Sequence, residues 1–272
     1  MDATAQGLGR DMMAKNKNLI EHSWREDGWQ FDYQTYREPK SNKTIVLLPS
    51  AQSKAKRRFP YYSRGLWAPD FKCNIIVVSD PTLQLNLSLL GGWFQGVNAN
   101  WVLPLVLAHI DRFLSEWGQK WEDCCFYGSS LGGFAALQAI CYHPQAKAFV
   151  EIPQIDLREY TDPSMRDLAQ LCYGEQAVKN VDDRYSNRIS VIETIRATQE
   201  IGRFFYFQKL NDRHHFDKHF SPFSQFLQSE GKQYAKSGYM LEVGDMSGQN
   251  SMGHSPLEKF EAIRLISFFL DL

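Results

Sequence analysis

A chain of 272 residues with 43% hydrophobic and 22% charged residues has the length and composition of one large globular domain with a sizeable core. Its formal net charge of −1 provides no overall attraction to nucleic acid or to an anionic membrane surface, so no nucleic-acid partner is expected. The longest obvious apolar run, residues 101–108, contains Pro104 and is too short to cross a bilayer. No membrane span is therefore predicted.

The first 28 residues are predicted to form a polar leader, in which residues 1–23 contain at most a short helix. Residues 1–18 lack the apolar core of a signal peptide. The five cysteines are an odd number and show no metal-ligand spacing. Cys73, Cys124, Cys125 and Cys141 are expected in the core, and the adjacent Cys124 and Cys125 cannot point at the same partner from one strand. This cysteine usage predicts a reducing, cytoplasmic location.

Short apolar runs bounded by turn residues predict seven strands. They cover residues 29–36, 44–48, 74–79, 123–128, 148–152, 203–208 and 239–243. The first of them alternates apolar and polar residues, which is typical of an exposed edge strand or a hairpin arm. A helical pattern over residues 104–117, ended by Gly118, lies between the third and fourth runs. Alternating strands and helices predict an α/β fold with a mainly parallel sheet and helices on both faces.

Residues 153–200 contain two or three helical patterns and no evident strand, which is more than one crossover needs, so we expect a small helical cap there. Residues 29–272 would then form one domain with a cap insertion. Near the C-terminus, Ser255 to Glu258 is predicted to be a capping box with Pro256 at the first helical position. The buried face of the helix that follows is predicted to contain Leu257, Phe260, Ile263, Ile266 and Leu270.

The motif Gly-x-Ser-x-Gly, formed by Gly128, Ser130 and Gly132, lies between the strand at 123–128 and an alanine-rich helical segment. Strand, sharp turn and helix in this order favour a nucleophile elbow over a structural turn. Such a turn holds a serine in a strained conformation with its hydroxyl accessible, and small residues on either side let the backbones approach. The motif predicts that Ser130 is a nucleophile.

A serine hydroxyl needs a base to take its proton and a third group to orient that base. His254 is the best candidate base of seven histidines, because it ends a glycine- and serine-rich loop after the last strand. Asp212, after the strand at 203–208, is the preferred acid, although an aspartate there could simply cap a turn. Asp217 and Asp156 remain alternatives for this role.

An oxyanion hole needs two donors aimed at the developing negative charge. The backbone N–H of Leu131, directly after the nucleophile, is the first candidate. The second is expected from the loop after the strand at 44–48, where Ala51 or Gln52 could supply its backbone N–H. His215 and His219 could share a helix face and bind a metal, but without a third ligand of defined spacing no metal site is predicted.

Two loops could contact a substrate. The basic and aromatic loop at residues 54–64 includes Lys56, Arg57 and Arg58, which could meet an anionic substrate, although a solvated surface loop is the simpler interpretation. Trp93 lies in the glycine-bracketed loop 91–96, which could face the substrate or be only a turn.

The elbow around Ser130, followed by Asp212 and then His254, resembles the α/β-hydrolase superfamily with its order of serine, acid and histidine. The resemblance covers roughly residue 29 to the end. It implies an eight-stranded, mostly parallel sheet, a cap after the sixth strand and an acyl-serine mechanism. The basic loop, the loop at 91–96 and the short cap are also similar to polysaccharide O-acetyltransferases of this fold.

These features predict a serine-dependent enzyme of acyl-ester chemistry, foremost an esterase acting on a small-molecule or carbohydrate ester. An O-acetyltransferase that moves an acyl group to a carbohydrate hydroxyl is the alternative, with acetyl-CoA as its donor; an esterase would need no cofactor. A catalytically inactive binding protein of the same fold is a further alternative. The sequence leaves the oligomeric state open.

Overall fold

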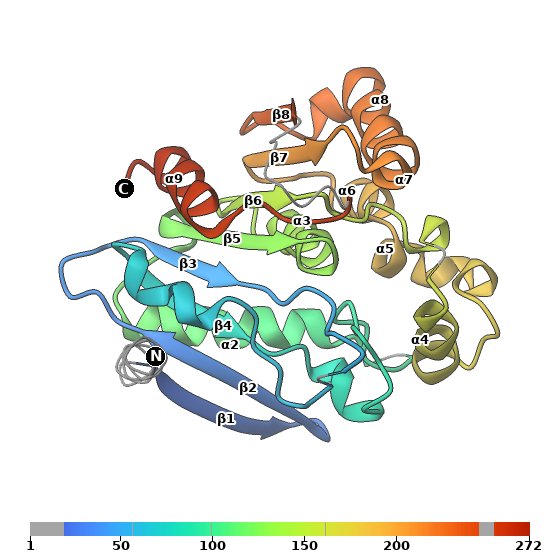
Figure 1. Ribbon diagram of the computed structural model, residues 1–272, viewed down its shortest axis with the longest axis horizontal. Helices are drawn as coiled ribbons and strands as arrows, with labels where there is room; N and C mark the ends of the chain where they lie inside the picture. The colour runs from blue at the N-terminus through green and yellow to red at the C-terminus, as the bar shows by residue number, and fades with distance from the viewer. Residues whose placement is uncertain (1–18, 56, 99, 161, 245–252) are drawn as a thin grey trace, which may run out of the picture.

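The computed structural model describes residues 19–55, 57–98, 100–160, 162–244 and 253–272. Within them, one eight-stranded sheet has the order β1-β2-β4-β3-β5-β6-β7-β8 (Figure 1). The β1–β2 and β2–β4 pairs are antiparallel, and the other neighbours are parallel. The strands are β1 (Ile20–Glu26), β2 (Trp29–Tyr36), β3 (Thr44–Leu47), β4 (Asn74–Val78), β5 (Cys124–Ser129), β6 (Lys147–Glu151), β7 (Phe204–Lys209) and β8 (Tyr239–Gly244). The α/β prediction is confirmed.

The edge strand β1 lies where a polar leader is predicted from the sequence. It pairs with β2 from Ile20–Thr35 to Glu26–Trp29. Asp27 and Gly28 connect the two strands with φ values of 50° and 80°, as a two-residue hairpin turn between twisted strands requires. The leader prediction is therefore wrong for residues 20–28. Of the two alternatives for residues 29–36, the hairpin arm is confirmed, because β2 pairs with β1 on one side and with β4 on the other and is not an edge strand. Residues 1–18 lie outside the described part of the chain.

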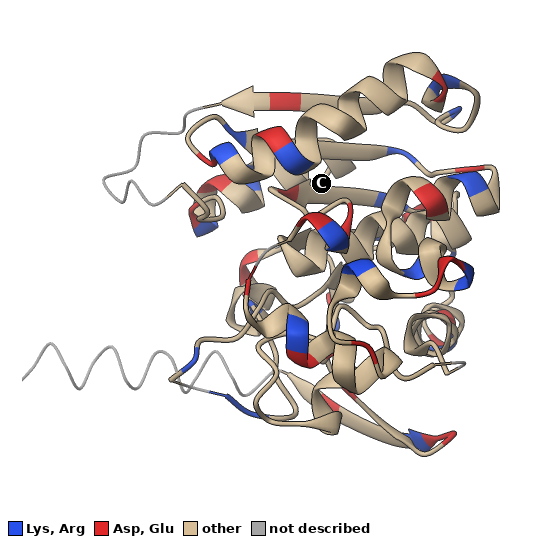
Figure 2. Cartoon of the chain, turned by 90° about the vertical axis from the view of Figure 1, so that its right-hand side faces the viewer, with Lys and Arg blue, Asp and Glu red and all other residues tan. Residues whose placement is uncertain are grey.

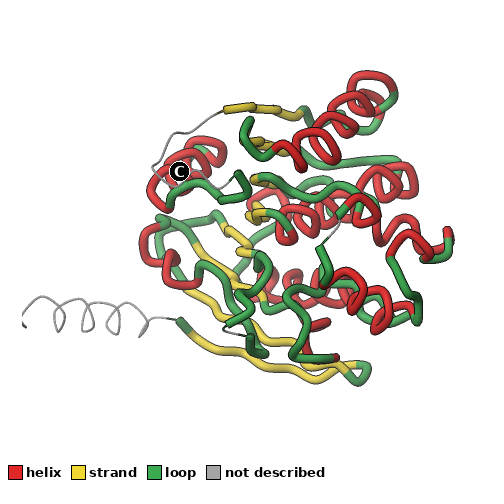
Figure 3. Tube along the Cα trace, turned by 45° about the vertical axis from the view of Figure 1, so that its right-hand side comes forward, coloured by secondary structure: helices red, strands yellow, loops and turns green. Residues whose placement is uncertain are grey.

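Helices cover both faces of the sheet (Figure 3). One face packs against α2 (Val102–Glu116), α3 (Leu131–Tyr142), α6 (Val191–Thr198) and α8 (Ser221–Ser229). The other packs against α9 (Lys259–Leu270) and the 3-10 turn η1 (Gly65–Asp70). The period of two along each strand divides the side chains between these layers: on β5, Cys124 and Phe126 face the first, and Cys125 and Tyr127 face the second.

The C-terminal helix α9 begins at Lys259, three residues after the predicted first helical position, Pro256. The Ser255 hydroxyl accepts a hydrogen bond from Lys209 Nζ (3.0 Å), and Glu258 occupies the N-cap without a side-chain cap. Phe260 is 78% exposed, so its predicted burial is wrong. The predicted burial of Ile266 and Leu270 is confirmed, and the helix also buries Ala262 and Phe269.

Residues 153–200, hereafter the cap segment, contain no strand in their described part, as predicted. They form α4 (Ser164–Tyr173), α5 (Ser186–Ile189), α6 and the 3-10 turns η4 (Leu157–Glu159), η5 (Val178–Asn180) and η6 (Asp183–Tyr185). The last of these helices, α6, contacts α3 and belongs to the layer on the sheet. The earlier part, with α4, lies beyond the carboxyl ends of the parallel strands (Figure 1).

The connection from β7 to β8 contains α7 (Arg213–His215), the π-helical turn η7 (Phe216–Phe220), α8 and the 3-10 turn η8 (Gly231–Gln233). Two further 3-10 turns, η2 (Pro81–Leu85) and η3 (Trp121–Asp123), follow β4 and precede β5. All five cysteines are free and buried, which confirms the predicted burial of Cys73, Cys124, Cys125 and Cys141. Among the described residues, no helix has the length and apolar character that a bilayer crossing requires.

Candidate active site

Ser130 lies at the sharp turn from β5 to α3 with φ 54° and ψ −117°, a combination that side chains rarely adopt. Its backbone N–H donates to the Glu151 carbonyl (3.0 Å). A Cβ on Gly128 would lie 2.2 Å from the carbonyl carbon of Gly132, and one on Gly132 would lie 2.8 Å from the Leu48 carbonyl oxygen. The two glycines are therefore needed for the close backbone approach that the elbow motif predicts.

The structure brings the predicted serine, histidine and acid together at the carboxyl edge of the sheet. Ser130 Oγ lies 3.0 Å from His254 Nε2, and His254 Nδ1 lies 2.7 Å from Asp212 Oδ2. The Asp212 side chain is buried, whereas that of His254 is 37% exposed. Ser130 follows β5, Asp212 follows β7 and His254 precedes α9. The sheet topology thus brings together segments that are far apart in sequence.

The two alternative acids lie elsewhere. Asp156 binds the guanidinium of Arg158 and accepts the Arg158 backbone N–H at the start of η4. Asp217 is exposed on η7. Among the described contacts, neither of them reaches His254, whose Nδ1 lies against Asp212.

The Asp212 carboxylate binds two imidazoles rather than one. Its Oδ2 faces His254, and its Oδ1 accepts from His215, both from the ring Nδ1 (3.1 Å) and from the backbone N–H (3.3 Å). Burial alone would raise the pKa of Asp212, but the hydrogen bonds from His215 and His254 outweigh it and hold that pKa well below its usual range. The carboxylate therefore stays ionised, as an acceptor for both rings must.

Gln154, which the sequence analysis does not single out, also contacts the serine. Its Nε2 lies 2.7 Å from Ser130 Oγ and 3.2 Å from His215 Nε2, and its Oε1 lies 3.3 Å from the indole Nε1 of Trp93. Because the indole N–H can only donate, the amide oxygen must face Trp93 and the amide NH₂ must face the other two. His215 Nε2 then accepts, which places the His215 proton on Nδ1, toward Asp212.

A positional signal for these two residues does exist in the sequence. Gln154 follows β6 by three residues at the same sheet edge where Asp212 follows β7 by three. His215 lies three residues after Asp212, one helical turn away. The position just beyond a parallel strand therefore marks Gln154, and the spacing of one helical turn from Asp212 marks His215.

Ligand atoms of Asp212, His215 and His254 lie within 4.8 Å of one another, close enough to consider a metal site. The two imidazole rings, however, stack at 4.0 Å with an interplanar angle of 22°, so their in-plane lone pairs run side by side rather than converging. His219 Nδ1 instead accepts the Ile155 N–H, and burial lowers the pKa of His219 to about 2. The geometry of these side chains is that of a hydrogen-bonded network.

The candidate oxyanion donors separate into two groups. The Gln52 backbone N–H donates to the Leu90 carbonyl (2.6 Å), so its prediction as a free donor is wrong. The N–H groups of Ala51 and Leu131 have no hydrogen-bond acceptor among the described residues. These two remain the candidates.

The cations of the loop at 54–64 that were predicted to contact substrate are not found beside Ser130 among the described residues. Lys56 lies outside the described residues, and no described contact of the exposed Arg57 or Arg58 reaches Ser130. Arg58 instead lines a hollow of about 560 Å³ beside β1 and β2. Another arginine of this loop, Arg64, reaches the elbow and donates to the Ser129 hydroxyl (2.6 Å).

Trp93 is buried, and its loop is held by Asp80 at the end of β4. The Asp80 carboxylate accepts the backbone N–H groups of Thr82 (2.9 Å), Gly92 (3.0 Å) and Phe94 (3.1 Å). The loop thereby fixes the indole N–H against Gln154. Trp93 is therefore linked to Ser130 only indirectly, through the side-chain amide of Gln154.

A buried carboxylate beneath the elbow holds the segment that follows His254. Glu151 accepts the Tyr127 hydroxyl (2.6 Å) and the Leu257 backbone N–H (2.7 Å), while Lys209 donates to Ser255. Burial raises the pKa of Glu151, and the nearby Arg64 opposes that rise. Glu151 on β6 and Lys209 on β7, both on the same side of the elbow strand β5, thus anchor the segment that follows His254.

No protein-family model and no curated protein sequence matches this chain. Among solved structures, a mutant capsule O-acetyltransferase of Neisseria meningitidis serogroup A in complex with CoA is similar, with a TM-score of 0.66 at 12% identity over 92% of this chain and 94% of that one. An S-formylglutathione hydrolase from Agrobacterium tumefaciens has a TM-score of 0.65 at 12% identity, covering 93% and 94%. A substrate-bound, fluorophosphonate-binding serine hydrolase of Staphylococcus aureus has a TM-score of 0.61 at 14% identity, covering 93% and 98%.

These structures are an acetyltransferase and two hydrolases, and at such low identity what they share with this chain is architecture. The sheet order, the turn at Ser130 and the helices on both faces agree with that architecture. The chain has the α/β-hydrolase fold.

Proposed function

We propose that this protein is a serine-dependent enzyme of acyl-ester chemistry, most directly an esterase, with Ser130, His254 and Asp212 as its catalytic triad. The observation that carries the proposal is the continuous chain of contacts from Ser130 Oγ to His254 Nε2 (3.0 Å) and from His254 Nδ1 to Asp212 Oδ2 (2.7 Å). The hydrolases and the acetyltransferase of the same fold support it at the level of architecture.

In the acylation step, Ser130 Oγ attacks the ester carbonyl while His254 Nε2 takes the hydroxyl proton. The ionised Asp212 stabilises the imidazolium that forms. The negative charge on the carbonyl oxygen is placed against the N–H groups of Leu131 and Ala51. The tetrahedral intermediate then collapses: the bond to the leaving alcohol breaks, His254 returns the proton to that alcohol, and acyl-Ser130 remains.

In the deacylation step, His254 takes a proton from water, and the hydroxide equivalent attacks the acyl carbonyl. The acid leaves, and the proton returns to Ser130 Oγ. If the hydroxyl of a carbohydrate replaces water, the same steps make the enzyme an O-acetyltransferase. The acetyltransferase of this fold with bound CoA favours this second candidate, in which acetyl-CoA would be the donor.

Labelling with a fluorophosphonate probe tests the proposal. The probe should phosphonylate Ser130 of the wild-type protein with loss of fluoride, and the Ser130→Ala variant should remain unlabelled. Ser129→Ala, which removes the other serine of the elbow, is the matched control and should still be labelled. An unlabelled wild type that retains its fold would contradict the proposal and favour a non-catalytic binding protein.

The other two triad members have their own expected effects. His254→Ala removes the base, and Asp212→Asn removes the charge that orients it, so each should slow labelling by at least about a hundredfold. Thermal melts check that the variants are folded. Equal labelling by Asp212→Asn and wild type would remove Asp212 from the proposed triad.

Mass spectrometry of the intact protein separates the two candidate activities. Wild-type protein is incubated with a simple acetyl ester or with acetyl-CoA, and the mass added to Ser130 is followed with and without a carbohydrate acceptor. An adduct that decays in water alone identifies an esterase. An adduct that forms from acetyl-CoA and decays only with the acceptor identifies a transferase.

A further inference from the structure

Two adjoining hollows are open on the cap segment. The first, of about 330 Å³, lies between η4, α4 and η5. The second, of about 520 Å³, continues along α4 and η5. Both are lined by Arg166, Gln176, Ala177 and Lys179, so they form one elongated groove. Each has a volume within the range of small-molecule sites, about 300–1,000 Å³.

The wall of the groove at Tyr160 is shared with the candidate active site. The Tyr160 ring lies 5.9 Å from that of Trp93 and 6.0 Å from that of His215, measured between ring centroids. Trp93 and His215 both contact the Gln154 amide, which contacts Ser130. A ligand in the groove would therefore lie one aromatic ring away from the residues around the serine.

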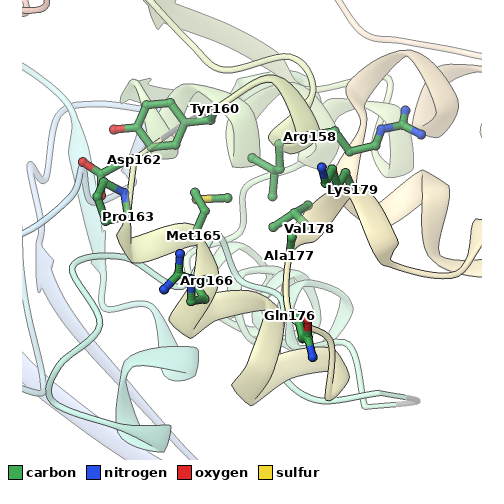
Figure 4. A pocket seen from close by; sticks show the side chains of 11 residues that line it. Arg158, Tyr160, Asp162, Pro163, Met165, Arg166, Gln176, Ala177, Val178 and Lys179 are labelled. Carbon is green, nitrogen blue, oxygen red and sulfur yellow. The ribbon is translucent and has the colours of Figure 1, made fainter.

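The lining of the groove combines an apolar floor with a polar rim. Leu157, Met165 and Val178 are buried beneath it, whereas Arg166 and Lys179 are exposed at its edge. Figure 4 shows Met165 in the middle of the first hollow, with Tyr160 and Lys179 on opposite sides of it. An apolar floor with an aromatic wall suits the C–H face of a sugar ring, and the rim suits its polar substituents.

Arg166, which lies where the two hollows meet, differs from the other arginines of the cap segment in its side-chain contacts. Arg158, Arg184 and Arg196 form salt bridges, and Arg188 donates to backbone carbonyls. Arg166 is the one arginine in the described part of the cap segment whose side chain has neither an ion pair nor a hydrogen bond. In Figure 4, the paired Arg158 turns its guanidinium away from the hollow.

Lys179 likewise has no such partner among the described residues, and it lines both hollows together with Arg166. The carboxylates Asp162 and Asp167 each line only one, and Asp162 already accepts the Ser164 N–H (2.8 Å). Charges of both signs are otherwise mixed across this side of the molecule (Figure 2). The two cations therefore mark a position for an anionic group.

We propose that the groove binds a sugar that carries a phosphate or carboxylate group, with the anion between Arg166 and Lys179 and the ring on the apolar floor. The inference rests on the proposed acyl-ester chemistry, for which it names the substrate class. Two sources share this chemistry: an acidic saccharide that receives or carries the acyl group, and the ribose phosphate of CoA as donor. Arginine and lysine bind either anion through charge-assisted hydrogen bonds.

Calorimetric titration of the Ser130→Ala protein tests the groove without turnover. The probes are CoA, a glucuronate-containing tetrasaccharide and the neutral tetrasaccharide maltotetraose. We expect at least one of the two anionic probes to bind. The double variant Arg166→Gln/Lys179→Gln in the same background should weaken that binding by about tenfold or more, and added salt should weaken it less than in the parent.

The matched control, Arg184→Gln/Lys232→Gln, removes two exposed cations that do not line the groove and should bind like the parent. Binding of CoA alone assigns the groove to the donor, and binding of the acidic tetrasaccharide alone assigns it to the saccharide. The proposal is overturned if neither anion binds, if the groove variant binds as tightly as the control, or if maltotetraose binds as well as both. Because Ser130 chemistry is measured separately by labelling of the wild type, the two proposals can fail independently.

Discussion

Gln154 and His254 contact the same oxygen atom from two sides. The Ser130 hydroxyl can donate its single proton to His254 Nε2 only if its other neighbour donates to it. The Gln154 amide meets that condition, because Trp93 holds its carbonyl oxygen on the far side. At the scale of single residues, the direction of the serine proton therefore depends on a buried tryptophan that does not contact the serine.

This arrangement predicts that Gln154→Glu is more harmful than Gln154→Met. A carboxylate at this position would accept the Ser130 proton and divert it from His254, whereas methionine only removes a donor. We expect a loss of about tenfold to a hundredfold in kcat/KM for the methionine variant and a larger loss for the glutamate variant. Hydrolysis of a chromogenic acetyl ester measures both.

Gln225→Glu, which introduces the same charge on an exposed face of α8, is the control and should hydrolyse the small ester like the wild type. A pH–rate profile adds a second readout, because a titratable carboxylate beside Ser130 should change the shape of the profile, which methionine cannot do. If both Gln154 variants kept the wild-type rate, Gln154 would have only a packing role.

At the scale of elements, the short connection between His254 and α9 has two anchors that do not belong to the helix. Glu151 accepts the Leu257 N–H, and Lys209 donates to Ser255. These anchors lie at the ends of β6 and β7, the strands that also precede Gln154 and Asp212. The same two strands thus position the acid, the amide and the segment that carries the base.

Glu151→Ala should lower both stability and activity. It would leave the buried Tyr127 hydroxyl and the Leu257 N–H without an acceptor, and it would leave the charge of Arg64 less well compensated. We expect a loss of roughly 3 kcal/mol in the free energy of unfolding, measured by urea denaturation, with slower labelling of Ser130.

Glu151→Gln keeps one acceptor oxygen and should therefore be milder in both measurements. If the alanine variant matched the wild type in stability and in labelling rate, the anchoring role of Glu151 would be refuted. Equal losses in the alanine and glutamine variants would instead show that the negative charge, rather than the acceptor, is what matters.

At the scale of the whole molecule, two buried carboxylates give the stability opposite dependences on pH. Hydrogen bonds lower the pKa of Asp212, so its contribution is present above about pH 4, its ordinary range, and is lost as the pH falls below that. Burial raises the pKa of Asp80 to about 6, although the N–H groups that it accepts partly oppose this. Its contribution is largest at low pH and is lost as the pH rises through about 6.

The Asp80 contribution can be isolated with Asp80→Asn, which cannot titrate. The difference in unfolding free energy between wild type and variant should be greater at pH 4.5 than at pH 7.5, by about 2 kcal/mol. Urea denaturation at the two pH values measures it. A difference that does not change with pH would show that Asp80 has an ordinary pKa in the folded protein.

Short apolar runs bounded by turn residues, alternating along the chain with helical patterns, are enough to predict seven of the eight strands and the mainly parallel sheet. β1 was missed because its side chains are mostly polar and none of them is fully buried, so it contains no apolar run. The Asp27-Gly28 turn is nevertheless a signal for a hairpin. The start of α9 was also missed, because Ser255 satisfies a lysine on another strand instead of capping the helix. A local motif cannot reveal such a partner.

Local residue types are enough to predict the elbow, since Gly128, Ser130 and Gly132 are the types that this turn tolerates, and the order of the elements predicts which strand ends meet at the sheet edge. The surroundings of the serine follow only from the packed fold: Asp212 rather than Asp156 or Asp217 faces His254, the Gln52 N–H donates to the Leu90 carbonyl, and Gln154 and His215 complete the network. Backbone conformation and periodicity are local properties of a chain, whereas a hydrogen bond depends on distances of about 3 Å between segments that only the packed sheet brings together.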